Sequence, residues 1–198
     1  MRHVMMIGLA AALALQGTPA LAGWTIMQAN QPAGVVKTTM TVTPPSGEWN
    51  RSSLRPSKKG ESWTKDGLSL NALTFFAGVL PGEAVYRERS KKDEPLPKFS
   101  DKMLAPEIVG IVEGSHRILL GSALFEVDAV EPATLGGHPG VRFAYRYTTQ
   151  DEEVRRKGEG RAAIVGGKLY LITFAAPEIH YFDANITDAR AIMDSAKI

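Results

Sequence analysis

Residues 141–175 read VRFAYRYTTQDEEVRRKGEGRAAIVGGKLYLITFA, and this stretch decides the fold. From Val141 to Thr148, apolar and aromatic side chains alternate with more polar ones, which predicts a β-strand with one buried face. Residues 154–165 predict a second strand. The pair Gly166-Gly167 predicts a hairpin, because both central residues of a type I′ turn adopt positive φ. The uncharged run LYLITFA, at 169–175, predicts a central strand that is covered on both faces.

One strand before this stretch and one helix after it complete the unit. Residues 125–130 alternate in the same way and reach Val141 through a glycine-rich turn. Pro177 ends the last strand because it cannot donate to a ladder. Beyond it, apolar residues recur at three- and four-residue steps and predict a helix. Because this helix and the four-stranded meander each have an apolar face to bury, we expect them to pack together. The apolar stripe is Ile179, Phe182, Ile186, Ala189, Met193 and Ala196.

The first half of the chain supplies more of the sheet. A strand is expected at 35–42, and residues 48–51 continue the sheet on the far side of a proline-rich break. Residues 61–76 predict a hairpin with Asp66-Gly67 at its tip. Residues 87–98 carry charges of both signs and two prolines, which is typical of an exposed loop.

A second helix is expected between residues 100 and 120. It either starts near Ser100 or starts late, at Pro106, because proline suits the first helical position. Within it, Gly110 and Gly114 either weaken the helix or mark close packing.

Length and composition indicate one ordinary domain. The chain has 198 residues, of which 44% are hydrophobic and 22% charged, as in soluble globular proteins. A formal net charge of +2 is too small to indicate nucleic acid or an anionic membrane as the partner. The absence of cysteine excludes disulfides, thiolate metal sites and cysteine nucleophiles.

The N-terminus has the pattern of a signal peptide. Arg2 and His3 precede an apolar run at 4–15, and Ala20-Leu21-Ala22 forms an A-x-A site. The alternative is a membrane anchor, but about a dozen apolar residues are too few to span a bilayer. We therefore expect residues 1–22 to be cleaved and residues 23–198 to form a single exported, periplasmic domain.

In its order of elements the chain resembles the PsbP-like superfamily. The best matches are Gly137 to Tyr147, Gly167 to Pro177, including "GKLYLITFAAP", and Phe182 to Ser195. That superfamily includes the extrinsic PsbP subunit of photosystem II, a Ran-binding import factor and bacterial envelope proteins of unassigned role. The resemblance implies an α+β fold, an α/β/α sandwich whose central antiparallel sheet carries a middle helix and a C-terminal helix. Nothing matches the residues that the photosynthetic member uses in its complex, and fold alone does not transfer function.

Catalytic and metal signatures are weak. Ser115 and His116 are adjacent, so on a helix they point about 100° apart and cannot act as a nucleophile–base pair; we expect both on the helix surface. His138 and His180 are expected to be isolated turn or surface histidines rather than metal ligands. Residues 183–188 lack the glycine of a calcium loop, and the G-x-G-x-x-A match at 158–163 has no helix after it. We expect no enzyme activity, cofactor or metal.

Two groups of residues are candidates for binding. A basic stripe on neighbouring strands would meet an acidic partner or a phosphate-bearing surface, or would be a solvated face whose charges pair with Glu152, Glu153 and Glu159. This stripe consists of Arg142, Arg146, Arg155, Arg156, Lys157 and Arg161. Five aromatic residues could instead line a pocket between the sheet and a helix: Phe75, Phe76, Tyr145, Tyr147 and Phe174.

Three hypotheses for function follow. The preferred one is a non-catalytic exported module that binds a protein or an envelope component through the sheet face or through the loop at 90–98. The alternative is a carrier of a small molecule or lipid that uses the aromatic pocket. The third is an enzyme that uses one of the histidines with a nearby carboxylate.

Overall fold

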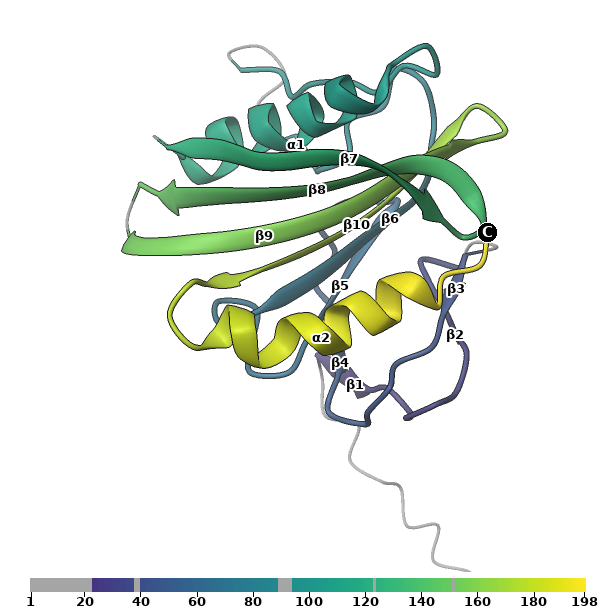
Figure 1. Cartoon of the computed structure of the whole chain (residues 1–198), viewed down its shortest axis with the longest axis vertical. Coiled ribbons are helices and arrows are strands. Elements are labelled where there is room, and N and C mark those ends of the chain that lie inside the picture. The colour runs from purple at the N-terminus through teal and green to yellow at the C-terminus, as the bar shows by residue number, and fades with distance from the viewer. Residues whose placement is uncertain (1–22, 38–39, 89–93, 123, 151) are drawn as a thin grey trace, which may run out of the picture.

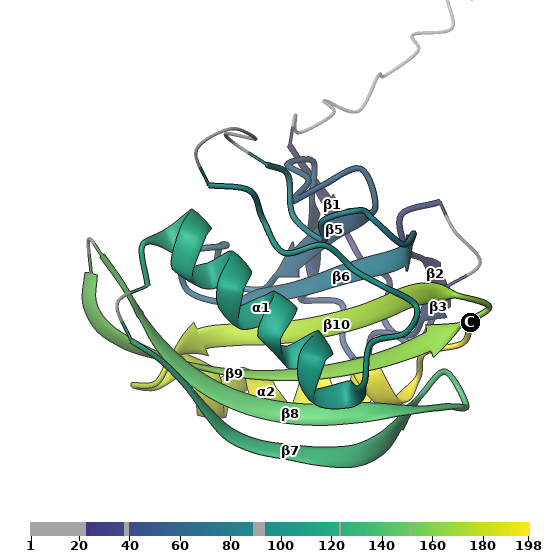
Figure 2. The ribbon, with the colours of Figure 1, turned by 90° about the horizontal axis from the view of Figure 1, so that it is seen from above.

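The computed structural model of the chain describes residues 23–37, 40–88, 94–122, 124–150 and 152–198. The expected signal peptide lies outside these residues, as does part of the loop at 90–98. One large antiparallel sheet lies between two helices, which cover opposite faces (Figures 1 and 2). The fold is therefore the expected α+β sandwich.

The sheet has eight strands in the order β1-β4-β5-β6-β10-β9-β8-β7, and a separate two-stranded ladder joins β2 to β3. The elements are β1 (Trp24–Ile26), β2 (Ala33–Gly34), β3 (Thr41–Val42), β4 (Asn50–Ser52), β5 (Gly60–Thr64), β6 (Ala72–Val79), α1 (Ala105–Leu120), β7 (Phe125–Leu135), β8 (His138–Thr149), β9 (Glu152–Val165), β10 (Lys168–Pro177) and α2 (Tyr181–Asp194).

The C-terminal meander is confirmed. The strands β7 to β10 pair consecutively, and Gly136-Gly137 and Gly166-Gly167 turn two of the hairpins with positive φ. The strand β10 is central, because it pairs with β9 on one side and with β6 on the other. The hairpin of β5 and β6 is confirmed as well, with Gly67 at φ +108° between its arms.

The sheet separates two hydrophobic cores. Under α2, buried residues of the helix such as Phe182 and Ile186 pack with Trp49, Trp63 and Phe174. On the other face, α1 packs through Ile108, Ile111 and Val112 against Phe143, Tyr145 and Leu171. Along β10 the side chains alternate between the two cores, as the period of two in a strand requires.

Two glycines of β9 make room for aromatic rings of β8. Gly160 pairs with Phe143 and Gly158 pairs with Tyr145. A Cβ atom on Gly160 would lie 2.3 Å from the Phe143 ring, and one on Gly158 would lie 2.2 Å from the Tyr145 ring. The rings therefore lie flat across β9, where side chains would otherwise stand.

The helix α1 starts late, at Ala105, with Pro106 in its first turn. The carboxylate of Glu107 accepts a hydrogen bond of 2.7 Å from the backbone N–H of Leu104. The two helical glycines differ. A Cβ on Gly114 would lie 2.7 Å from the Pro97 ring, so Gly114 marks close packing, whereas nothing lies within 4 Å of one on Gly110.

The expected strand at 35–42 is wrong. Of its described residues, the last two form the strand β3, while Val36 and Lys37 adopt positive φ and leave the extended conformation. The N–H of Val36 donates instead to the buried carboxylate of Glu61, at 2.8 Å. Glu61 also accepts from the Trp63 indole at 2.8 Å and pairs with Arg51 at 3.1 Å. This buried carboxylate fixes the turn that replaces the strand.

Residues 195–198, which follow α2, contact two earlier parts of the chain. Thr41 and Lys197 exchange two backbone hydrogen bonds of 2.9 Å, so residues 195–198 hold the end of the β2–β3 ladder. Ile198 packs against the β7–β8 turn, where a Cβ on Gly136 would lie 2.8 Å from its side chain. Ile179 precedes α2 and is 81% exposed, so it does not belong to the apolar stripe in which it was expected.

The glycine–aromatic packing predicts opposite effects of two Gly→Ala substitutions. Gly160→Ala should lower the free energy of unfolding by about 1–3 kcal/mol, because overpacking displaces the Phe143 ring. Gly110→Ala, in the open on α1, should raise it by up to about 1 kcal/mol. Urea denaturation of both variants measures this. Equal effects would contradict the packing described.

Candidate functional site

The face of β7–β9 that points away from α1 is densely charged, and we call it the charged face. On it, Glu126 and Asp128 of β7 lie beside Arg146 of β8, and Glu131 lies beside Arg142. On β9, Lys157 lies opposite Arg146, and Arg161 lies opposite Arg142. The helix α2 borders this face along β9 (Figure 1).

Ion pairs join these charges. The guanidinium of Arg142 contacts Glu131 at 2.5 Å and that of Arg146 contacts Asp128 at 2.5 Å, where both hydrogen bonding and the charge of Asp128 raise the pKa of Arg146. Three further pairs connect β9 to its surroundings: Lys157 with Glu178 at 3.1 Å, Arg161 with Asp194, and Arg190 with Glu159. Arg155 lies 3.9 Å from Glu126.

The six residues of the expected basic stripe are thus not on one face. Arg156 pairs with Tyr147, on the side of α1, where it is buried and donates to the Ser69 carbonyl at 2.6 Å. The other five share the charged face with acidic partners. The surface they form therefore consists of paired positive and negative charges, and it is not a positive stripe.

The five aromatic residues of the expected pocket are divided by the sheet. Phe75 and Phe174 belong to the core under α2, whereas Phe76, Tyr145 and Tyr147 belong to the core under α1. All five are buried. They do not line one common pocket.

The prediction that Ser115 and His116 lie on the helix surface is wrong. Both are buried on α1. The His116 ring lies among the rings of Tyr86, Phe125, Tyr145 and Tyr147, with centroids 4.9–6.1 Å away. Its Nδ1 donates to the Val112 carbonyl at 2.8 Å, because a carbonyl can only accept. Burial lowers the pKa of His116 to about 4, so the ring is neutral at pH 7.

Beside this cluster lie two adjoining recesses. The inner recess, of about 290 Å³, is lined by Pro56, Ser115, His116, Leu119 and Leu120. The outer recess, of about 520 Å³, is lined mainly by charged residues, among them Lys58, Lys59 and Lys98. Both recesses share Tyr86 and Arg87. No local sequence pattern predicts these recesses, because Arg87 begins the charged stretch at 87–98 that predicts an exposed loop.

The histidines His138 and His180 both lie beside turns. His138 begins β8, next to the glycine turn. His180 precedes α2 with φ +70° and ψ −62°, and the N–H of Tyr181 donates across it to the Ile179 carbonyl at 2.9 Å, which is a tight γ-turn. Among the described residues, no group of three histidine, aspartate or glutamate side chains is placed to hold a metal ion. Residues 183–188 are helical, and 158–163 are inside β9.

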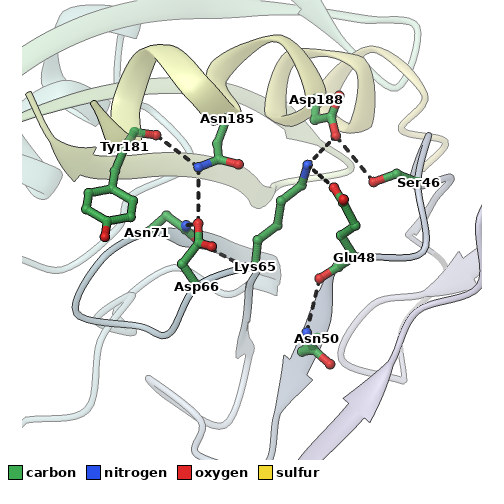
Figure 3. Close-up of polar contacts among 9 residues, drawn as sticks. All are labelled: Ser46, Glu48, Asn50, Lys65, Asp66, Asn71, Tyr181, Asn185 and Asp188. Atoms are coloured by element: carbon green, nitrogen blue, oxygen red, sulfur yellow. Dashed lines mark hydrogen bonds and ion pairs between the residues drawn. The ribbon is translucent and has the colours of Figure 1, made fainter. Parts of the chain in front are cut away.

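A polar cluster ties α2 to the hairpin of β5 and β6 (Figure 3). The Lys65 ammonium contacts Asp188 at 2.6 Å and Glu48 at 2.8 Å, and it lies 5.5 Å from the Trp49 ring. Burial lowers the pKa of Lys65, but the hydrogen bonds to Asp188 and Glu48 outweigh it, and the pKa is raised. Next to it, Asp66 accepts from Asn71 at 2.5 Å and from Asn185 at 3.3 Å.

Comparison with known proteins identifies the fold. No protein-family model and no curated protein sequence matches the chain. The solution structure of cyanobacterial PsbP (CyanoP) from Synechocystis sp. PCC 6803 is 15% identical, with a TM-score of 0.57, over 94% of this chain and 98% of that one. The chain therefore has a PsbP-like fold, as the resemblance implied.

Two other solved structures are more distant. A protein of Bacteroides thetaiotaomicron VPI-5482 is 9% identical over 80% of this chain and 44% of that one, with a TM-score of 0.45. LpqN of Mycobacterium tuberculosis, involved in cell envelope biogenesis, is 11% identical over 90% and 80%, with a TM-score of 0.33. Among the described residues, no helix has the length and apolar character needed to cross a membrane.

The buried histidine predicts a pH-dependent stability. In the unfolded chain His116 titrates near its usual pKa of about 6.5, whereas burial holds the folded pKa at about 4. Between these pH values the unfolded chain binds more protons at this residue than the folded chain does. Acidification from pH 6.5 to 4 should therefore lower the free energy of unfolding by about 3 kcal/mol. Burial raises the pKa values of the neighbouring Tyr86 and Tyr145, so both stay neutral over this range. His116→Phe should reduce the pH dependence of unfolding by that amount, and His138→Gln should not. A His116→Phe profile parallel to that of the wild type would contradict the burial of this ring.

The tie around Lys65 predicts a measurable coupling energy. A double-mutant cycle with Lys65→Met and Asp188→Asn should give about 1 kcal/mol, because only 12% of the Lys65 side chain is exposed. The control is the ion pair of Arg117 and Glu113 on α1, whose charged atoms are 2.9 Å apart but whose side chains are 45% and 35% exposed. For this pair we expect a coupling energy of about 0.3–0.5 kcal/mol. Urea denaturation gives both values. A coupling for Lys65 no larger than that for Arg117 would show that the cluster does not anchor α2.

Proposed function

We propose that this protein is an exported, non-catalytic accessory module that recognises a protein or envelope partner through its charged face. The signal-peptide pattern of residues 1–22 supports export. In this proposal cleavage after Ala22 releases the domain into the periplasm, where it acts by binding alone.

The observation that carries the proposal is the ordered array of ion pairs on the open part of the sheet. Arg142 and Glu131 are 51% and 52% exposed and still paired, and Arg155 and Glu126 are 53% and 46% exposed. Side chains that are already held by neighbours lose less conformational entropy when a partner docks. A rigid, exposed sheet face with fixed donors and acceptors therefore suits recognition of a folded surface.

The balance of charge determines what kind of partner suits this face. Each basic residue of the face has an acidic neighbour within 4 Å, so the long-range attraction for a polyanion is weak. Specificity then comes from the positions of individual charges, as in the polar rim of protein–protein interfaces. We therefore favour a protein surface of mixed charge over nucleic acid or an anionic lipid surface.

Site-specific photocrosslinking in the producing cell tests this function. A photoreactive residue in place of Arg142 or Arg155 should give one adduct of defined mass with the same partner from both positions. Replacement of Lys102 or Arg117, which are exposed beside or on α1 at the opposite side, should give none. The protein recovered from the periplasmic fraction should begin at Gly23. Adducts that are absent, or equal at all four positions, would refute the charged face as the binding surface.

A further inference from the structure

We propose that the two recesses at Tyr86 form a binding site for a small amphipathic organic anion. The apolar part of the ligand would occupy the inner recess and its anionic group would lie at Arg87, facing the outer recess. This goes beyond partner recognition and does not depend on it, because the recesses lie by α1 and the charged face lies on the opposite side of the sheet.

The inner recess is apolar enough to hold a hydrocarbon group. Pro56, Leu119 and Leu120 contribute its apolar walls, and Tyr86 adds an aromatic one. Leu120 is 38% exposed there, although it ends a helix whose other apolar side chains are largely buried. A volume of about 290 Å³ is at the lower end of ligand pockets, so the occupant is small.

The polar groups of both recesses include buried hydroxyls without a partner. Ser115 is fully buried and lines the inner recess, and Ser57 is 7% exposed and lines the outer one. Within the described part of the chain, neither Oγ atom has a hydrogen-bond partner. Buried hydroxyls are usually paired in folded proteins, so these two are unsatisfied polar atoms at the recesses. Both are closed to solvent in this structure, so a ligand oxygen would reach them when neighbouring side chains move apart on binding. His116, neutral and held by Val112, adds a fixed polar ring beside Ser115.

The charges where the two recesses meet, at Arg87, favour an anionic ligand. Arg87 lines both recesses, and no described residue forms an ion pair or hydrogen bond with its guanidinium. Lys58, Lys59 and Lys98 surround the outer recess, against Glu83 and Glu88. Glu83 is partly engaged, because its carboxylate accepts from the N–H of Leu80 at 2.9 Å. Among the described residues there is an excess of positive charge, and none of them pairs with the Arg87 guanidinium next to the apolar walls. This arrangement matches a carboxylate or phosphate on a short hydrocarbon group.

Titration with octanoate and octyl phosphate tests the site. Calorimetry should show one bound anion per chain, and amide chemical shifts should change around residues 56–59, 86–87 and 115–120. Octan-1-ol should bind at least about tenfold more weakly, and inorganic phosphate alone should not bind, because each lacks one half of the recognised chemistry. The relative affinities of the two octyl anions identify the preferred head group.

Two substitutions distinguish a binding site from a packing defect. Arg87→Gln should weaken octanoate about tenfold and leave octan-1-ol unaffected, whereas the exposed control Lys102→Gln should change neither. Ser115→Ala should raise the melting temperature of the free protein, since it removes an unpaired buried hydroxyl, and should weaken the anion. The proposal fails if octanoate does not bind at millimolar concentration, if octan-1-ol binds equally well, or if Arg87→Gln behaves like Lys102→Gln.

Discussion

The fold depends on one strand that belongs to two cores. In β10 the side chains of Tyr170, Ile172 and Phe174 enter the core under α2, and those of Leu169 and Leu171 enter the core under α1. Its backbone is paired on both sides, with β6 and β9. A charged residue on either face of this strand would be buried without a partner, which explains why the run from Leu169 to Phe174 contains none. The two helices can cover opposite faces only because this strand is apolar on both.

The sheet is used differently on its two sides. Under α1, the rings of β8 lie over glycines of β9 and surround the neutral His116, so the centre of this side is tightly packed. The recesses by Tyr86 lie beside this cluster. On the other side, α2 covers the sheet as far as β9. The strands beyond it, β8 and β7, carry paired charges. The molecule therefore offers two chemically distinct surfaces, a mixed-charge face and an apolar recess with a cationic rim.

The sequence predicted the meander, both helices and the central strand, because each depends on local periodicity and on turns that require glycine. The sequence-based prediction was wrong where contacts between residues far apart in the sequence determine the structure. Val35 and Val36 have the composition of a strand, but the Glu61 carboxylate, 25 residues away, takes the Val36 N–H. The arginines of β8 and β9 read as a stripe, but their acidic partners come from β7 and α2. His116 read as a surface residue because the rings around it come from β7, β8 and the segment before residue 87. The recesses likewise combine residues 56–59, 82–88 and 115–120, and no local pattern joins these.

The contacts of residues 195–198 have a consequence for the order of assembly. Lys197 pairs with Thr41 through the backbone, and Ile198 fills the space above Gly136. The central strand β10 likewise joins β6 from across almost a hundred residues. A chain that is synthesised from its amino end cannot complete the layer near its beginning until residues 168–198 exist. The early segments therefore complete their pairing only after residues 168–198 have been synthesised, so the contacts that are most distant in sequence are the last to form.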